Sequence, residues 1–180
     1  MLSLCPLTLE NAEQIRLWRN ADLSPWRTPY LLTQEMQEDW YRNTVCNRNS
    51  PHRFWAVVED SRYIGMVGLT NLDWQNRWCE LNLIMSPDRW KLADKAVDLL
   101  LEQAFDSLGL AMVCGECYTC GSVFSVWDGI VSRWMQNGGS GVYRTMLPQR
   151  KFWQGKFHES MYFSLNCDGY QMMKRGDVAE

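Results

Sequence analysis

The sequence predicts a single α+β domain with a mostly antiparallel central sheet flanked by about four helices. Its length is the first observation: 180 residues, 46% of them apolar, can bury one good core and are short for two domains. The second is the order of periodicities. Three strand-like segments joined by tight turns occupy the middle of the chain, and helix-like segments lie on either side of them. We expect residues 1–166 to form this domain.

The N-terminal part predicts one strand and two helices. Residues 3–8 have a short strand pattern, and apolar residues at helical spacing predict a helix over residues 9–19. A loop with two prolines follows over residues 21–32. Thr33 is expected to cap a second helix over residues 33–45.

Three strands are expected in the middle of the chain, the first two joined by a tight turn at Asp60 and Ser61. They cover residues 53–60, 63–72 and 78–85. The clearest helical stripe follows over residues 91–108, and Gly109 is well placed to stop it.

The last part of the chain predicts a strand, a helix and a hairpin. These elements cover, in order, residues 111–118, 122–136, 142–147 and 156–165. The two hairpin strands surround a turn at Gln154 and Gly155. The segment 167–180 is polar and is expected to be a frayed tail.

Composition disfavours several classes of partner. With 18 Lys and Arg against 21 Asp and Glu, the net charge is −3, which argues against broad electrostatic capture of nucleic acid or of an anionic membrane. No apolar stretch approaches the length needed to span a bilayer, and the N-terminus reaches an acidic residue too early for a secretory signal. We therefore expect a soluble, cytoplasmic protein.

Seven cysteines without a signal peptide are expected to be reduced thiols. Cys114, Cys117 and Cys120 have the spacing that begins an iron–sulfur binding run, but Phe124 stands where that run needs a fourth cysteine. The segment also has a strand pattern, which places Cys114 and Cys117 on opposite faces. Small core residues are favoured over metal ligands here, and no metal is expected.

The order of these elements and four sequence stretches resemble the GNAT acetyltransferase superfamily. The stretches run from about residue 4 to residue 166 and read IRLWRN, FWAVVEDSRYIGMVGLTNLDWQNRWCELNLIMSP, AFDSLGLAMVCGECY and RKFWQGKFHESMYFSLN. The chain is similar to the branch that contains ribosomal-protein N-terminal acetyltransferases and acetyltransferases of nucleotide-linked amino sugars. The resemblance implies a mixed sheet in which one pair of neighbouring strands splays apart.

The resemblance also implies that acetyl-CoA, the donor substrate, lies between the splayed strands, here residues 78–85 and 111–118. Its pyrophosphate would lie on the N-terminus of helix 91–108, where unpaired backbone N–H groups favour an anion. The residues expected to contact it are Leu83, Ile84, Met85, Arg89, Trp90, Lys91 and Ala93.

The loop expected to hold the pyrophosphate departs from the superfamily pattern Q/R-x-x-G-x-G/A. This sequence has DRWKLAD, without the glycines that let the backbone come close to the phosphates. Arg89 and Lys91 can supply charge, whereas Trp90 stands where little bulk is expected. Two interpretations stay open: side-chain charge in a reshaped loop holds the cofactor, or the loop no longer holds it.

Glu80 is the expected catalytic base. It matches a glutamate that this branch often carries on the first splayed strand, and a primary amine must lose a proton to attack a thioester. Neighbouring Trp78 and Leu81 would give it the partly desolvated setting that such a role requires. The alternative is that Glu80 points outward or pairs with Arg77.

The general acid stays unassigned. Similar proteins have an asparagine after the ECY stretch and then a helix with a tyrosine that can protonate the departing thiolate. This chain has Gly121 near the first position and Trp127 or Asp128 near the second. Tyr118 or Cys120 could replace the acid, and water can also protonate a thiolate.

The acceptor side is expected to include Trp18, Arg19 and Asn20, which match a WRN signature of similar proteins. An equal alternative is a helix C-terminus with a favourable arginine and an asparagine stop. Trp74 and Tyr118 are the other expected acceptor contacts.

Two functions stay open at this point. The first is an N-acetyltransferase that transfers an acetyl group from acetyl-CoA to a primary amine of a small molecule, such as an amino sugar nucleotide, or to a protein N-terminus. The second is an inactive GNAT-like protein that binds a partner or another ligand at the old cleft. Apolar edge strands are compatible with a homodimer.

Overall fold

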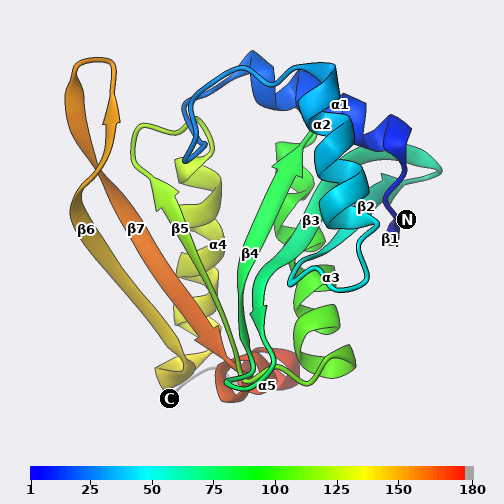
Figure 1. Cartoon of the computed structure of the whole chain (residues 1–180). Helices are drawn as coiled ribbons and strands as arrows, with labels where there is room; N and C mark the ends of the chain where they lie inside the picture. Colours follow the sequence, from blue (N-terminus) through cyan, green and yellow to red (C-terminus); the bar gives the residue numbers. More distant parts are fainter. Residues whose placement is uncertain (177–180) are drawn as a thin grey trace.

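The computed structural model describes residues 1–176, which form a seven-stranded mixed sheet with five α-helices (Figure 1). The strand order is β1-β2-β3-β4-β5-β7-β6, and β4–β5 is the parallel pair. The strands are β1 (Leu2–Pro6), β2 (Arg53–Glu59), β3 (Arg62–Asp73), β4 (Trp78–Met85), β5 (Met112–Tyr118), β6 (Val142–Trp153) and β7 (Lys156–Asn166). The helices are α1 (Leu9–Ala21), α2 (Gln34–Trp40), α3 (Ala93–Leu101), α4 (Phe124–Asn137) and α5 (Cys167–Arg175). The predicted fold class is confirmed.

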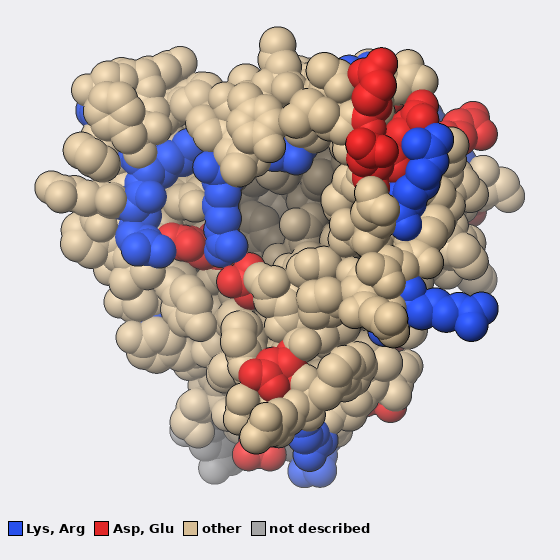
Figure 2. Space-filling model, in the orientation of Figure 1, with Lys and Arg blue, Asp and Glu red and all other residues tan. Residues whose placement is uncertain are grey.

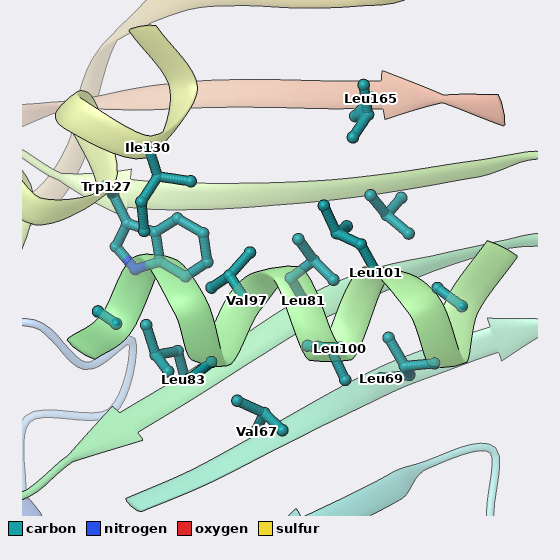
Figure 3. Packing of buried hydrophobic residues seen from close by; sticks show 14 of the residues in the cluster. Val67, Leu69, Leu81, Leu83, Val97, Leu100, Leu101, Trp127, Ile130 and Leu165 are labelled. Carbon is teal, nitrogen blue, oxygen red and sulfur yellow. The ribbon is translucent and has the colours of Figure 1, made fainter. Parts of the chain in front are cut away.

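Apolar clusters lie on both faces of the sheet. The larger one lies under α3 and α4, where Leu81 and Leu83 of β4 meet Val97 and Leu100 of α3 (Figure 3). The smaller one contains Ile15 of α1 and lies on the opposite face. Burying one such side chain completely contributes roughly 1.5–3 kcal/mol, so these two layers stabilise the sheet that carries the site.

Both predicted tight turns are confirmed. Asp60 and Ser61 have φ angles of 47° and 70°, and Gln154 and Gly155 have φ angles of 48° and 83°. Positive φ at both central residues is the geometry of a two-residue hairpin that matches the twist of its strands.

The helix expected over residues 91–108 is divided into three parts. A 3₁₀ turn over Trp90–Leu92 leads into α3, and a π-helical turn over Glu102–Ser107 follows it. Gly109 has a φ of 63° and stops the helix as expected.

The expectation of a frayed tail from residue 167 is wrong for Cys167–Arg175, which form α5. Asn166 caps this helix by accepting a hydrogen bond from the N–H of Gly169 at 2.9 Å, and Gly176 stops it with a φ of 68°. The rest of the expected tail, residues 177–180, lies outside the described residues.

α5 is docked on the chain that follows α3. The ring of Tyr170 stacks on Phe105 with a centroid distance of 4.7 Å, and its hydroxyl donates to Asp106 at 2.7 Å. Lys174 adds an ion pair to the same carboxylate at 3.0 Å. These contacts bury the apolar side of a helix whose sequence is polar overall.

Asp106 gives this docking a pH dependence. Hydrogen bonds from Tyr170 and Lys174 outweigh partial burial and hold the pKa of Asp106 below its ordinary value. Its contribution is therefore complete above the carboxyl pKa of the unfolded chain and is lost as the pH falls below about 4. We expect Asp106→Asn to lower the urea midpoint at pH 7 and to lower it less at pH 3. An equal decrease at both pH values would contradict this assignment.

β4 and β5 are paired over only three positions, from Trp78–Met112 to Glu80–Cys114. Beyond these pairs the two strands diverge (Figure 1), so within the described chain their facing edges carry N–H and C=O groups without a strand partner. The splayed pair that the resemblance implied is therefore present.

Gly115 lets β7 pack closely against β5. A Cβ atom at this position would lie 2.4 Å from Cζ of Phe163, so the ring on β7 packs directly against the backbone of β5.

None of the helices in residues 1–176 has the length and apolar character needed to cross a bilayer.

Candidate active site

The gap between β4 and β5 opens into a cavity of about 510 Å³. Successive side chains of a strand point to opposite faces, so Glu80, Asn82 and Ile84 of β4 share one face of the sheet. All three line the cavity, together with Glu116 and Tyr118 of β5. Figure 2 shows a hollow with basic side chains along one side and an acidic side chain at its lower edge.

Arg27, from the loop between α1 and α2, bridges the two diverging strands. Its Nη1 donates to Oε2 of Glu80 at 3.2 Å, and its Nη2 donates to Oε2 of Glu116 at 3.4 Å. The expected alternative, a pair between Glu80 and Arg77, does not form, because Arg77 donates to the carbonyl of Gly109. Glu80 therefore faces the cavity, with one quarter of its side chain exposed.

Glu116 is the most deeply buried carboxylate of the site, with 8% of its side chain exposed. It accepts hydrogen bonds from Ser160 at 2.7 Å and from Nε of Arg150 at 3.0 Å. Burial raises the pKa of Glu116, but Ser160, Arg150 and Arg27 together outweigh burial, so its pKa lies below the ordinary value. Glu116 is thus an anion at neutral pH, and it holds both arginines in place.

Lys151 fastens the loop between α1 and α2 over the cavity. This buried ammonium donates to the carbonyl oxygens of Ser24 and Trp26. It also lies 5.0 Å from the ring centroids of Tyr118 and Trp153. Burial lowers the pKa of Lys151. The loop that carries Arg27 is therefore fixed to β6 by a cation between two aromatic rings.

Two buried polar atoms on the cavity wall have no partner among the described residues. They are Oδ1 of Asn82 and Nε of Arg19. A buried polar group without a partner costs about 1–3 kcal/mol, so such atoms commonly bind a ligand or an ordered water molecule.

The expected pyrophosphate loop is occupied by its own side chains. Arg89 donates to Glu59 at 3.2 Å and to Asp88 at 2.7 Å, and the hydroxyl of Ser86 donates to Asp88. The Ser86 hydrogen bond and Arg89 outweigh partial burial and lower the pKa of Asp88, which is therefore charged. An anionic ligand at this loop would have to compete with Asp88 and Glu59 for Arg89.

The other residues expected at the cofactor are divided between the cavity and the core. Leu83 and Ile84 line the cavity, whereas Met85 is buried in the core. Trp90 packs against the larger apolar cluster and is not among the residues that line the cavity. Of the two remaining residues expected at the cofactor, Lys91 is exposed and Ala93 is buried at the start of α3.

The residues expected on the acceptor side are separated. Arg19 lines the cavity, and its neighbour Asn20 makes two hydrogen bonds to the backbone of Leu32, at 2.8 and 2.9 Å, which fix the end of the loop. Trp18 stacks on Tyr63 with a centroid distance of 5.3 Å. Tyr118 lines the cavity, whereas Trp74 lies in the exposed turn between β3 and β4 and not on the cavity wall.

The residues near the unassigned acid position are also placed. Trp127 is buried and lines the cavity, and Asp128 forms an ion pair with Arg144. Burial raises the pKa of Tyr118, and nearby Glu116 raises it further, so this phenol keeps its proton at neutral pH.

Sequence reasoning missed Arg27, Glu116 and Arg150 as site residues. Glu116 lies in the ECY stretch that carries the resemblance, but the resemblance implies no role for it. The cysteines of the same segment are free thiols: Cys114 and Cys117 are buried, and Cys114 donates a weak hydrogen bond to the carbonyl of Cys79. Within residues 1–176, no group of three or more His, Cys, Asp or Glu side chains is arranged to hold a metal ion.

The fold and the cavity together define a class of protein. A mixed sheet that opens between two parallel strands, with a carboxylate at the point of divergence, is the arrangement that the resemblance implies for an acetyl-CoA-dependent acetyltransferase. Comparison with known families is consistent with this class, because residues 2–119 match the model described as "Acetyltransferase (GNAT) domain". The chain belongs to the GNAT acetyltransferase family.

Solved structures share the fold at low sequence identity. One is the spermidine N-acetyltransferase of Vibrio cholerae in complex with CoA and spermine, with a TM-score of 0.78 and 17% identity over 94% of this chain and 98% of that chain. A mutant form of the spermidine/spermine N-acetyltransferase from the same organism has a TM-score of 0.75 and 18% identity, over 95% and 98% of the two chains. Among curated proteins, no match was found.

Proposed function

We propose that this protein is an N-acetyltransferase that uses acetyl-CoA as donor and a primary amine of a small molecule or of a protein N-terminus as acceptor. The observation that carries the proposal is the early divergence of β4 and β5 after Glu80, which opens the cavity and leaves amide groups of β4 without a strand partner in residues 1–176. One of those N–H groups would polarise the thioester carbonyl as a single oxyanion-type donor. Family membership and the CoA complex of a protein with the same fold support the choice of donor.

Glu80 is the proposed base. Its carboxylate lines the cavity where the two strands part, so an amine bound there can pass a proton to it as the new N–C bond forms and the C–S bond breaks. Arg27 holds one carboxylate oxygen of Glu80 and so fixes its direction.

Tyr118 is the proposed acid. It lines the cavity on the opposing strand, and its raised pKa means that it carries a proton at neutral pH. Tyr118 would donate its phenolic proton to the CoA thiolate that leaves as the C–S bond breaks, and solvent would then reprotonate the phenolate. This is the role for which the sequence offered no assigned residue.

For the donor, the residues around α3 offer a partial fit. Leu83 and Ile84 present backbone and apolar surface in the cleft, and the start of α3 supplies the favourable end of a helix dipole. Exposed Lys91 adds a positive charge in the turn before α3. We propose that this charge replaces part of the anchoring that the missing glycines would have given.

A second candidate is a GNAT-like binding protein without acetyl transfer. The observation that favours it is the loop before α3, where Asp88 and Glu59 already hold Arg89. In that case the cavity would bind a different ligand, and Arg19 and Asn82 would still offer it the polar atoms for which the described part of the chain supplies no partner.

Thermal unfolding with acetyl-CoA, CoA and dephospho-CoA tests the choice between the two. A ligand that binds only the folded state at 100 times its Kd adds about 2.7 kcal/mol, which raises the Tm of a chain of this size by roughly 5–10 °C. We expect such a shift with acetyl-CoA and CoA. No shift at millimolar acetyl-CoA would overturn the acetyltransferase proposal and leave the binding protein.

A further inference from the structure

Arg150 lies in an irregular part of β6, beside the proposed acceptor site. The register between β6 and β7 shifts between Leu147 and Lys151, and Gln149 within this bulge has a φ of 53°. Bulges of this kind re-aim side chains and are common next to active sites. Here the bulge brings Arg150 to Glu116, a residue of β5 that also contacts Arg27.

The guanidinium of Arg150 is only partly engaged. Its Nε donates to Glu116 at 3.0 Å, and in the described part of the chain no partner is found for its two Nη groups. Half of the side chain, 51%, is exposed. It lines a groove of about 550 Å³ that also contains Arg27, Glu80 and Tyr118. An arginine held at Nε with a free Nη edge is suited to bind a carboxylate or phosphate.

The charges of this groove do not suit a polycation. Its two carboxylates, Glu80 and Glu116, are matched by two guanidiniums, Arg27 and Arg150. The four charges balance, so a polyamine would find no excess negative charge here. An anionic group, in contrast, would find hydrogen-bond donors in the two Nη groups of Arg150, which have no partner among the described residues.

We propose that Arg150 is a specificity-determining residue that binds an anionic group of the acceptor, a phosphate or a carboxylate. The acceptor is then an amine with a negative charge in the same molecule, its amine at Glu80 and its anion at Arg150. This inference rests on the proposed acetyltransferase function and names the chemical class of its acceptor.

The test uses pairs of amines that differ only in the anionic group: glucosamine 6-phosphate with glucosamine, and β-alanine with β-alaninamide, with spermidine as the cationic reference. Acetylation is followed by release of free CoA thiol and by the mass of the N-acetyl product. We expect kcat/KM to favour the anionic member of at least one pair by about tenfold to a hundredfold, the range for one charge-assisted contact. The pair that shows the preference identifies phosphate or carboxylate as the anion.

In Arg150→Gln, the kcat/KM of the anionic amine divided by that of its partner without the anionic group should fall close to one, because the KM of the anionic amine rises. Arg150→Lys should keep part of this ratio. Arg175→Gln, on the exposed side of α5, is the matched control and should keep the ratio. Thermal shift with acetyl-CoA checks that each variant is folded.

Other outcomes overturn one of the two claims. The inference fails while the acetyltransferase stands if spermidine, or the amines without an anionic group, have a kcat/KM equal to that of the anionic amines. It also fails if the preference for the anionic amine survives in Arg150→Gln. It fails likewise if acetyl-CoA binds and no anionic amine is acetylated. If acetyl-CoA does not bind and no amine is acetylated, the proposed function fails, and the inference fails with it.

Discussion

Glu80→Gln is expected to lower kcat for amine acetylation by about a hundredfold to ten-thousandfold, the range that a positioned general base contributes. Glutamine keeps the size of the side chain and one oxygen for Arg27, but it cannot take a proton from the amine. Binding of acetyl-CoA should change little. The measurement is steady-state turnover together with thermal shift, so that a folding defect is separated from a catalytic one.

The pH profile makes this prediction specific. An amine that is already neutral in solution needs a base less, so the deficit of the variant should narrow as the pH rises towards the pKa of the acceptor amine. Glu159→Gln is the matched control, because Glu159 is an exposed glutamate on β7. A Glu80→Gln enzyme with unchanged kcat across the whole pH range would remove Glu80 from its proposed role.

Gly141→Ala is expected to destabilise the fold by about 1–3 kcal/mol or more, the cost of forcing extra atoms into a packed contact. A Cβ atom at position 141 would lie 2.4 Å from the backbone N and Cα of Gly169 and 2.5 Å from Oδ1 of Asn166, which caps α5. Backbone atoms cannot rotate away as a flexible side chain can. The packing of α5 against the turn before β6 should therefore be lost first.

Gly129→Ala is the matched control for this measurement. Gly129 lies inside α4, and a Cβ there would meet no atom within 4 Å. Alanine favours a helix over glycine by about 0.8–1.0 kcal/mol, so this variant should be slightly more stable than the parent. Urea midpoints of the three proteins give the comparison. A Gly141→Ala midpoint equal to that of the parent would contradict the close contact with α5.

Most of the fold could be predicted because its signals are local. The turn at Asp60 and Ser61 and the cap at Thr33 depend on residues a few positions apart, and each is confirmed. α5 was missed although its signals are equally local, an asparagine cap at Asn166 and a glycine stop at Gly176. The polar composition of the segment favours a tail, because the contact of Tyr170 with Phe105 that docks the helix has no sequence signature.

The site was only half visible from the sequence. The resemblance located Glu80, which the structure places on the cavity wall. Its partner Arg27 lies 53 residues away in the sequence, and no sequence pattern near Glu80 predicts this contact. Arg150 reaches Glu116 through a bulge, and a bulge changes the alternation on which strand patterns depend. Contacts between side chains that are far apart in the sequence depend on how the sheet is assembled, and they produce no periodic pattern in the sequence.

The short parallel contact between β4 and β5 has a mechanical consequence. Three residue pairs join the two parts of the sheet, and Arg27 links the parts again beside the last of these pairs, because it contacts both Glu80 and Glu116. Lys151 of β6 holds the loop that carries Arg27 through the carbonyl oxygens of Ser24 and Trp26. The two parts of the sheet are therefore joined by a short stretch of backbone pairing and by ion pairs between side chains. Substitutions of Arg27 or Lys151 are therefore expected to change the width of the cleft, and hence the ligands that it accepts, without altering a backbone hydrogen bond between β4 and β5.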